Sequence, residues 1–500
     1  MTRLDDNRSY LKELIGFTAL LFAVRLLLAA LLPLSPQEAY YWVYSRHPAL
    51  SYFDHPPLVA WTIGFCTFLL GDHSWAIRLG ALLYATGTAW LAYGLGRDAF
   101  NSRVGFQSAL LVSLLPTYAI NALIMTPDAA LVFFWTLTLY LSFSAIRKNR
   151  PAWLLPAGLA LGLALDSKYT AVLLPLSLGL FLILPAEQRR WWKRWQLYGG
   201  LTAALLVFSP VLVWNSRHDW ASLAFQSTDR AKEMIRFNWG DFGAFWATQI
   251  GVLTPLVFVG LAAALGVGIK KIGQKRYWTE TFLVCAALPL IGLFTLVATR
   301  EWVKMNWLIP AYLPLIILMA ACFGPAGQVR FFRRTGTWAW AMVVFFFLLL
   351  HLWWFFPQIK VSGSMDTLTG WQNLAGQLRI EQARMPRPAE TFVLAWGHKT
   401  AAELEFHFKG PPAVAAQTAL NQKALAYDYW FDPAPLVGRD ALLVWSPFEN
   451  YPFEHTDLLL QFFERVEKAE SFTVYRGPYP LRDFRIYRCY GYKGFDFKRP

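Results

Sequence analysis

Cysteine and charged side chains are both scarce in this chain of 500 residues. Only four cysteines are present, and their scattered positions offer neither a disulfide framework nor the spacing of a metal site. Charged residues make up 16% of the chain, where a soluble globular protein has about a quarter. Hydrophobic residues reach 56%, so the composition excludes an ordinary soluble domain and indicates an integral membrane protein.

Several familiar functional signatures are also missing. The C-terminal 140 or so residues hold no glycine-rich phosphate loop, no serine nucleophile elbow and no zinc spacing. The net charge of +14 comes from short basic clusters between apolar runs, which is the pattern of membrane topology rather than of a nucleic-acid-binding face. We therefore expect no nucleic acid partner. No spacing assigns a metal ligand, and a divalent metal ion stays open as a cofactor.

Long apolar runs organise the first 360 residues. A membrane span needs about 20 apolar residues, and the first run is too long for a signal-peptide core, so we expect it to be retained. On this measure the chain has eleven spans, at Leu14–Leu34, Trp75–Leu95, Val104–Ile124, Ala129–Ile146, Trp153–Leu165, Tyr169–Leu184, Leu197–Val213, Phe242–Ile269, Thr279–Ala298, Trp307–Phe323 and Trp338–Phe356.

The loops between these runs predict the topology. Short loops rich in Lys and Arg stay cytoplasmic. Alternate loops, at 97–103, 147–150, 187–195, 270–276 and 330–334, together hold sixteen Lys or Arg. This pattern predicts a cytoplasmic N-terminus and, with an odd number of spans, an outer location for residues 361–500.

Two further segments of the first outer loop are predicted to lie at the membrane surface. Ala39–Tyr44 is rich in bulky aromatic residues suited to the lipid headgroup level. Leu58–Leu70 is apolar but shorter than a span, so we expect an interfacial helix that starts at the Pro56-Pro57 pair.

The composition changes after the last span. Residues 361–500 are more charged and contain no run long enough to span a membrane, which separates them from the transmembrane domain of residues 1–360. Their patterns predict a small α/β domain, with a helix at Met365–Ala383 and strands at Thr391–Trp396, Ala441–Trp445, Ser471–Tyr475 and Phe484–Cys489.

Ionisable residues gather in the predicted outer loops. Glu38, Asp54 and His55 lie in the first outer loop, and Asp128 and Lys168 follow in the next two outer turns. Ionisable side chains at the membrane edge are costly unless they face water, a partner or a substrate, so they are candidates for a functional site. If the substrate of such a site were a lipid-linked sugar phosphate, displacing the polyprenyl phosphate would require cations at the phosphate. A hydroxyl acceptor would also require a carboxylate that takes its proton. Alternatively, these acids and bases pair with one another and only fix the loops.

Six short motifs, each at the boundary of a span, carry a family resemblance. They are QEAYYW, YFDHPPLVAW, TPDAA, LDSKYTAVLLP, SPVLVWNSRHDW and MNWLIPAYL, in this order. Together they resemble the bacterial polyprenyl-phosphate-sugar-dependent glycosyltransferases of the GT-C superfamily, relatives of the dolichyl-phosphate-mannose protein mannosyltransferases and of the aminoarabinose transferase that modifies lipid A. The resemblance covers nearly all of the membrane region and, more weakly, the C-terminal domain.

The resemblance implies a fold, a location and a reaction. The fold is an α-helical polytopic membrane protein of the GT-C type with a periplasmic α/β domain, in the inner membrane of a bacterium. The donor is an undecaprenyl-phosphate sugar, and the anomeric centre is inverted. The acceptor is a glycolipid, another envelope glycan or a protein at the periplasmic face of the lipid bilayer.

The resemblance also implies site residues. Members begin the first outer loop with an Asp-Glu pair, and this chain has Gln37 at the first of these positions. Either Glu38, Asp54 or Asp128 therefore acts as the base, or the acceptor is already ionised and no base is required. The predicted catalytic carboxylates are Glu38, Asp128 and Asp54; the predicted ligands of the donor phosphate are Lys168, His55 and Arg300; the predicted substrate-binding residues are Tyr41, Tyr169, Asn215 and His218.

Two other functions compete with this prediction. A transporter or flippase of lipid-linked sugars would place polar residues near the middle of the bilayer, whereas here they crowd at one face. A catalytically silent relative is kept open by Gln37.

Overall fold

The computed structural model describes residues 2–229, 237–322, 330–449 and 456–497. The chain forms two compact units, and each is built from separate stretches of sequence. Unit 1 comprises Met1–Ala29, His55–Thr62 and Arg78–His351; unit 2 comprises Ala30–Asp54, Ile63–Ile77 and Leu352–Pro500. Part of the predicted first outer loop thus belongs to the same unit as the C-terminal domain, which the sequence does not predict.

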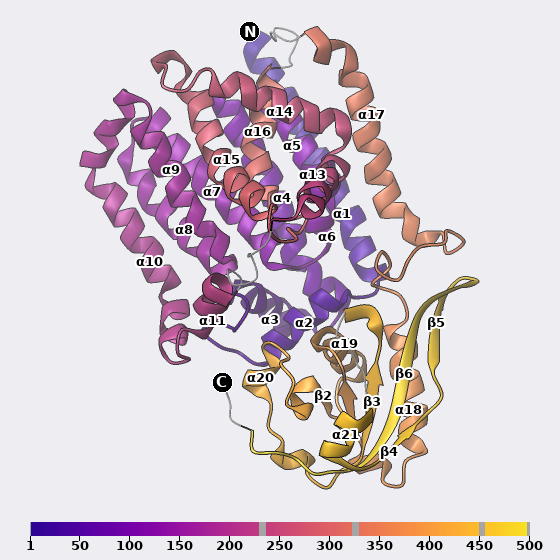
Figure 1. Ribbon diagram of the computed structural model, residues 1–500. Helices are drawn as coiled ribbons and strands as arrows, with labels where there is room; N and C mark the ends of the chain where they lie inside the picture. Colours follow the sequence, from indigo (N-terminus) through magenta and orange to yellow (C-terminus); the bar gives the residue numbers. More distant parts are fainter. Residues whose placement is uncertain (1, 230–236, 323–329, 450–455, 498–500) are drawn as a thin grey trace. The chain divides into compact units, whose positions relative to one another are not determined.

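Unit 1 is a bundle of apolar helices (Figure 1). Each of the eleven predicted runs is helical over most of its length. The helices are α1 (Thr2–Leu31), α4 (Ser74–Ala99), α5 (Ser102–Leu114), α6 (Pro116–Leu123), α7 (Pro127–Arg147), α8 (Leu154–Ser167), α9 (Leu173–Ile183), α10 (Trp195–Ser216), α13 (Trp239–Leu253), α14 (Pro255–Ile269), α15 (Trp278–Val297), α16 (Ile309–Cys322) and α17 (Arg330–Leu352).

Five helices of the described chain are long and apolar enough to cross a membrane, and three bent pairs raise this number to eight. The five are α1, α7, α10, α15 and α17. The chain bends by 64° between α5 and α6 and by 106° between α13 and α14. Pro116 and Pro255 begin the second helix of these pairs, because proline has no N–H to continue a helix. The count of eleven spans stays a prediction.

Small residues bring α8 and α10 close together. A Cβ on Gly158 would lie 2.0 Å from the carbonyl oxygen of Gly200. The two backbones can approach each other only because neither position has a side chain. Helix pairs in membranes commonly use small residues in this way.

Unit 2 contains a six-stranded sheet and its covering helices (Figure 1). The strand order is β2-β1-β3-β6-β4, and β5 also pairs with β6. β1, β2 and β3 are parallel, while β6 runs antiparallel to β3, β4 and β5. The strands are β1 (Phe392–Ala395), β2 (Val414–Ala416), β3 (Ala441–Trp445), β4 (Phe463–Lys468), β5 (Phe472–Arg476) and β6 (Tyr479–Tyr492).

Both faces of the sheet are buried at its centre. β1 and β3 are apolar throughout, as parallel strands covered on two sides must be. On one face Trp371 of α18 (Trp371–Ala383) packs on Phe484 with ring centroids 5.7 Å apart. On the other, Leu459 and Phe462 of α21 (Thr456–Phe462) join the core with Tyr487. The C-terminal part of unit 2 therefore has the predicted α/β class.

Helix α2 (Pro36–Arg46), from the first outer loop, packs within unit 2. Trp42 meets Phe406 of α19 (His398–Phe408) edge-on, with ring centroids 5.3 Å apart. Tyr44 meets Trp430 of α20 (Tyr427–Trp430) at 5.4 Å. The predicted interfacial helix is α3, whose bounds, Leu58–Leu70, are the predicted ones.

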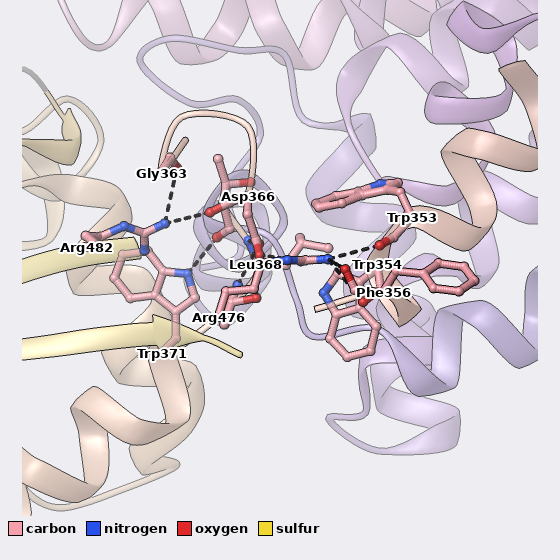
Figure 2. Close-up of polar contacts among 11 residues, drawn as sticks. Trp353, Trp354, Phe356, Gly363, Asp366, Leu368, Trp371, Arg476 and Arg482 are labelled. Atoms are coloured by element: carbon pink, nitrogen blue, oxygen red, sulfur yellow. Dashed lines mark hydrogen bonds and ion pairs between the residues drawn. The ribbon is translucent and has the colours of Figure 1, made fainter. Parts of the chain in front are cut away.

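An arginine cluster secures the segment that follows α17. The Arg476 guanidinium donates to Asp366 at 2.7 Å and to the Trp353 carbonyl at 3.0 Å (Figure 2). Arg482 donates to the Asp366 carbonyl at 2.9 Å and lies over the Trp371 ring, 4.8 Å from its centroid. Burial lowers the pKa of Arg482 to about 10. The cluster therefore ties the chain after the last apolar helix to β5 and β6.

Candidate functional site

Asp128, Lys168 and Asn306 form a buried polar cluster in unit 1. The Lys168 ammonium donates to Asp128 Oδ1 at 2.8 Å, and the Asn306 amide donates to Asp128 Oδ2 at 2.7 Å. The side chains of Lys168 and Asp128 are only 11% and 5% exposed. Lys168 Nζ also lies 5.6 Å from the ring centroid of Trp307. Two residues predicted separately from the sequence are thus brought together.

Helix ends position all three residues. Asp128 is the second residue of α7, where the partial positive charge of the helix N-terminus favours a carboxylate. Lys168 has an extended backbone directly after α8, which turns the chain out of the helix. Asn306 lies just before α16. Three segments distant in sequence therefore converge on one carboxylate.

The ion pair leaves Lys168 with capacity for a ligand. A lysine ammonium has three N–H donors, and among the described residues only Asp128 accepts one of them. The remaining donors suit an anionic oxygen, while Asp128 keeps the ammonium in place. Because the pair is buried, removing either partner leaves a charge without compensation.

A second contact joins this turn to the loop after α10. The Tyr169 hydroxyl and the Ser222 hydroxyl lie 2.6 Å apart. The backbone N–H of Asn238 donates to the carbonyl of Thr299 at 2.8 Å, which joins the same loop to the loop before α16. The turns that hold Asp128 and Lys168, the loop after α10 and the loop before α16 are therefore connected to one another.

Asn215 and His218 are held by the backbone around them. The buried Asn215 amide donates to the Val211 carbonyl at 2.9 Å and accepts from the Leu223 N–H at 3.2 Å. The half-buried His218 ring stacks on Trp214, with ring centroids 4.1 Å apart. Both residues shape the loop after α10, and their predicted contacts with substrate stay predictions.

The two other predicted phosphate ligands lie in unit 1 as well. His55 is half-buried just before α3, and Arg300 is exposed just after α15. Their predicted role stays a prediction.

Glu38 completes the N-terminal cap of α2, in which Ser35 is the N-cap residue. Its carboxylate accepts from the Ser35 N–H at 3.0 Å, and its own N–H donates to Ser35 Oγ at 3.3 Å, which is a complete capping box. Glu38 is fully buried in unit 2. One oxygen of this predicted catalytic carboxylate is therefore used in the hydrogen bond that caps α2.

Asp54 accepts from two tyrosines of α2. The Tyr40 hydroxyl donates to Asp54 Oδ1 at 3.2 Å, and the Tyr44 hydroxyl makes a short hydrogen bond to the same oxygen. Burial, together with the Asp54 charge, holds the pKa of both tyrosines well above the usual value. Tyr41 is buried beside them and accepts from Gln37 at 2.8 Å.

Metal ligands do not gather in the described part of the chain. No group of three or more His, Cys, Asp or Glu side chains there could hold an ion. Both oxygens of Asp128 already accept hydrogen bonds from Lys168 and Asn306. These residues do not fit a metal site.

Two sets of residues at these sites were not predicted. Asn306 lies in the MNWLIPAYL motif, but nothing in the motif indicates that its amide reaches Asp128. Tyr44 follows Tyr40 by four positions on α2, so the helical repeat alone could have placed these two on one face. Their partner Asp54 could not be identified in this way.

Known proteins similar to this chain are glycosyltransferases. Residues 54–214 match the model of the dolichyl-phosphate-mannose-protein mannosyltransferase family. The lipid A galacturonosyltransferase RgtD of Rhizobium johnstonii is 29% identical over 320 residues, which are 62% of this chain and 64% of that protein. The undecaprenyl phosphate-alpha-4-amino-4-deoxy-L-arabinose arabinosyl transferase of Erwinia tasmaniensis is 27% identical over 56% of this chain and 51% of its own length. The chain thus spans less than two thirds of these relatives.

The fold matches a solved structure over nearly the whole chain. ArnT from Cupriavidus metallidurans bound to undecaprenyl phosphate superimposes with a TM-score of 0.63 and 14% identity, over 94% of this chain and 97% of that one. The predicted resemblance to GT-C glycosyltransferases is therefore confirmed, and so is the predicted class of a helical membrane protein with a C-terminal sheet domain.

Proposed function

We propose that this chain, which has the fold of the GT-C glycosyltransferases, transfers a sugar from undecaprenyl phosphate to an envelope glycolipid or glycan. The observation that carries the proposal is the buried cluster of Lys168, Asp128 and Asn306, which offers a fixed ammonium at one end of a membrane helix bundle. We place this end at the periplasmic face of a bacterial inner membrane, as the basic loops at the other helix ends predict.

In the proposed reaction an acceptor oxygen forms a bond to the anomeric carbon of the donor sugar. The bond between that carbon and the phosphate oxygen breaks, so that undecaprenyl phosphate leaves and the anomeric centre is inverted. The acceptor hydroxyl gives its proton to a carboxylate. Negative charge grows on the leaving phosphate, and a preorganised cation near it lowers the barrier.

The residues have different roles in this proposal. Lys168 binds the leaving phosphate, and His55 and Arg300 are further ligands for it. Asp128 is a positioning residue, because it holds the ammonium of Lys168 at 2.8 Å. The role of Glu38 and Asp54 as the base stays a prediction from the sequence.

A transfer assay with the purified full chain in lipid nanodiscs tests the proposal. We expect Lys168→Met to lose donor binding and transfer at least tenfold, since a charge-assisted contact to phosphate is lost. Lys168→Arg should retain part of the binding. Lys271→Met is a matched control: Lys271 pairs with Glu280 at 3.1 Å and lies over a tyrosine ring, but in a loop predicted to be cytoplasmic.

Three results would contradict the proposal. Transfer at the parental rate by a Glu38→Gln, Asp128→Asn double variant would remove the roles of these carboxylates. Equal losses in Lys168→Met and Lys271→Met would show that the effect is not specific to Lys168, which removes its role at the donor phosphate. Donor binding without any transfer in the parent would indicate a catalytically silent relative.

A further inference from the structure

Unit 2 contains a polar cleft of about 410 Å³ that the proposed reaction does not use. This volume is within the range of about 300–1,000 Å³ that holds small ligands. We call it the α2–β2 cleft. Its lining residues all belong to unit 2, namely Trp42, Arg46, Asp72, Glu405, Lys409, Gly410, Pro412, Ala413 and Val414.

Two cations lie in the lining of the α2–β2 cleft. The Arg46 side chain is 57% exposed, stacks over Trp42 and lies 3.8 Å from Asp72. The exposed Lys409 donates one N–H to the Asp72 carbonyl at 2.7 Å, and its remaining donors have no protein acceptor among the described residues. Both cations can therefore donate to a ligand without breaking a buried contact.

Two carboxylates lie in the same cleft. Asp72 accepts from the Trp42 indole at 2.8 Å, which fixes one of its oxygens. Glu405 accepts from the Tyr427 hydroxyl at 2.7 Å through one oxygen. Burial raises the pKa of Glu405 to about 7, so at neutral pH this side chain is divided between an acceptor and a hydroxyl donor.

The segment from Gly410 to Val414 forms another wall of the cleft. Gly410 has nothing within 4 Å of the position that a Cβ would occupy, so the cleft is open there. The segment leads into β2, which is the edge strand of the sheet. Lys409 has a left-handed backbone with φ 49°, and this conformation turns the chain from α19 into the wall.

The mixture of groups selects one class of ligand. An apolar ligand would bury Arg46 and Lys409 without hydrogen-bond partners, which is costly. A cationic ligand would be repelled by the same two residues, and a bare anion would meet Asp72 and Glu405. A ligand with several hydroxyl groups and one acidic substituent satisfies both kinds of residue, because hydroxyls donate to the carboxylates while the acid accepts from the cations.

We propose that the α2–β2 cleft binds an anionic sugar unit, carboxylated or phosphorylated, of the glycan acceptor. This inference rests on the proposed function, since an acceptor glycan is what brings such a sugar to this protein. The cleft then selects the acceptor, while Lys168 binds the donor.

Saturation-transfer NMR on the full chain in nanodiscs tests the inference with four probes: glucuronate, glucose 6-phosphate, neutral glucose and inorganic phosphate. We expect at least one of the two acidic sugars to bind at least tenfold more tightly than both glucose and inorganic phosphate. Lys409→Asn should remove this preference, because the loss of one charge-assisted hydrogen bond costs about tenfold. Asparagine tolerates the left-handed backbone at this position.

Two variants control for general damage. Lys409→Arg keeps the charge and should keep most of the affinity. Lys493→Asn changes an exposed lysine that likewise donates to a backbone carbonyl, of Leu460 at 2.8 Å, but lies outside the cleft, so it should leave binding unchanged.

The outcomes separate this inference from the proposed function. Equal binding of glucose and the acidic sugars, or no effect of Lys409→Asn, overturns the sugar site. Equal binding of phosphate and glucose 6-phosphate, without a preference for glucuronate, reduces it to an anion site and also overturns the inference. Undecaprenyl phosphate binding is measured on the same samples: if it is absent while an acidic sugar binds the cleft, the proposed function fails and the cleft assignment stands.

Discussion

The ion pair between Lys168 and Asp128 predicts a strong and reciprocal effect on stability. At 2.8 Å the attraction between two unit charges is about 6 kcal/mol at an effective dielectric constant of about 20. Both side chains are almost fully buried, so Asp128→Asn or Lys168→Met leaves one charge without its partner. We expect each single substitution to lower the free energy of unfolding by about 3–5 kcal/mol.

The double variant distinguishes a true pair from two independent residues. Asp128→Asn with Lys168→Met removes both charges, so its loss should be at least about 2 kcal/mol smaller than the sum of the two single losses. A reversible denaturant titration of the purified chain in mixed micelles measures all four proteins. Losses that add within about 0.5 kcal/mol would refute the reasoning, because they would mean that the two side chains do not stabilise each other.

The same variants test whether the donor phosphate binds the Lys168 ammonium. A ligand that binds only the folded chain stabilises it according to its concentration and affinity. In Asp128→Asn the Lys168 ammonium lacks the carboxylate that holds it in place, so undecaprenyl phosphate should stabilise this variant less than the parent but more than Lys168→Met. Lys168→Met should lose the stabilisation. If Asp128→Asn loses the stabilisation by undecaprenyl phosphate as completely as Lys168→Met does, Asp128 has a role in donor binding beyond that of the counter-charge.

Three further outcomes are expected in unit 2. Burial raises the pKa of Glu405 from an ordinary value of 4.5 to about 7, so the folded chain loses stability as pH rises from about 4.5 to 7. Glu405→Gln should therefore gain up to about 3 kcal/mol over the parent between pH 5 and pH 8, measured by thermal unfolding at each pH; a constant difference would contradict this. Arg476→Met removes the ion-pair partner of the buried Asp366 carboxylate and should cost about 3–5 kcal/mol, seen as faster proteolysis after α17; unchanged proteolysis would mean that the arginine cluster does not hold this segment. Tyr44→Phe removes one donor to Asp54 and should cost about 1.5–3 kcal/mol in thermal unfolding, and no loss would mean that Tyr40 alone suffices.

The sequence predicts the positions of the helices more accurately than the positions of the breaks between them. Leu58–Leu70 has the predicted bounds because a proline pair starts it and Gly71, with φ 80°, ends it. Phe242–Ile269 reads as one run, yet the chain turns by 106° at Pro255. Proline alone does not decide this, since Pro210 lies inside the continuous helix α10. The chain leaves the helix at Thr254, whose φ is 67°, and the pattern of apolar residues does not reveal this.

The candidate site was predictable in its parts but not in its contacts. Asp128 and Lys168 could be placed at one end of the bundle, because each follows or begins an apolar run on the same predicted side. Their distance of 2.8 Å depends on how α7 and α8 pack, and on the glycines that bring α8 against α10. The pairing that the sequence left as an alternative is present, and it is compatible with a phosphate ligand.

The membership of α2 in unit 2 limits how the C-terminal part can be exchanged or isolated. A fragment of residues 361–500 would leave the rings of His398, Tyr427 and Trp430 without the tyrosines that pack on them. In a chimera with a relative, the sheet domain and its own Pro36–Arg46 helix would have to be exchanged together. Two stretches that lie far apart in the sequence must therefore remain compatible with each other for unit 2 to fold.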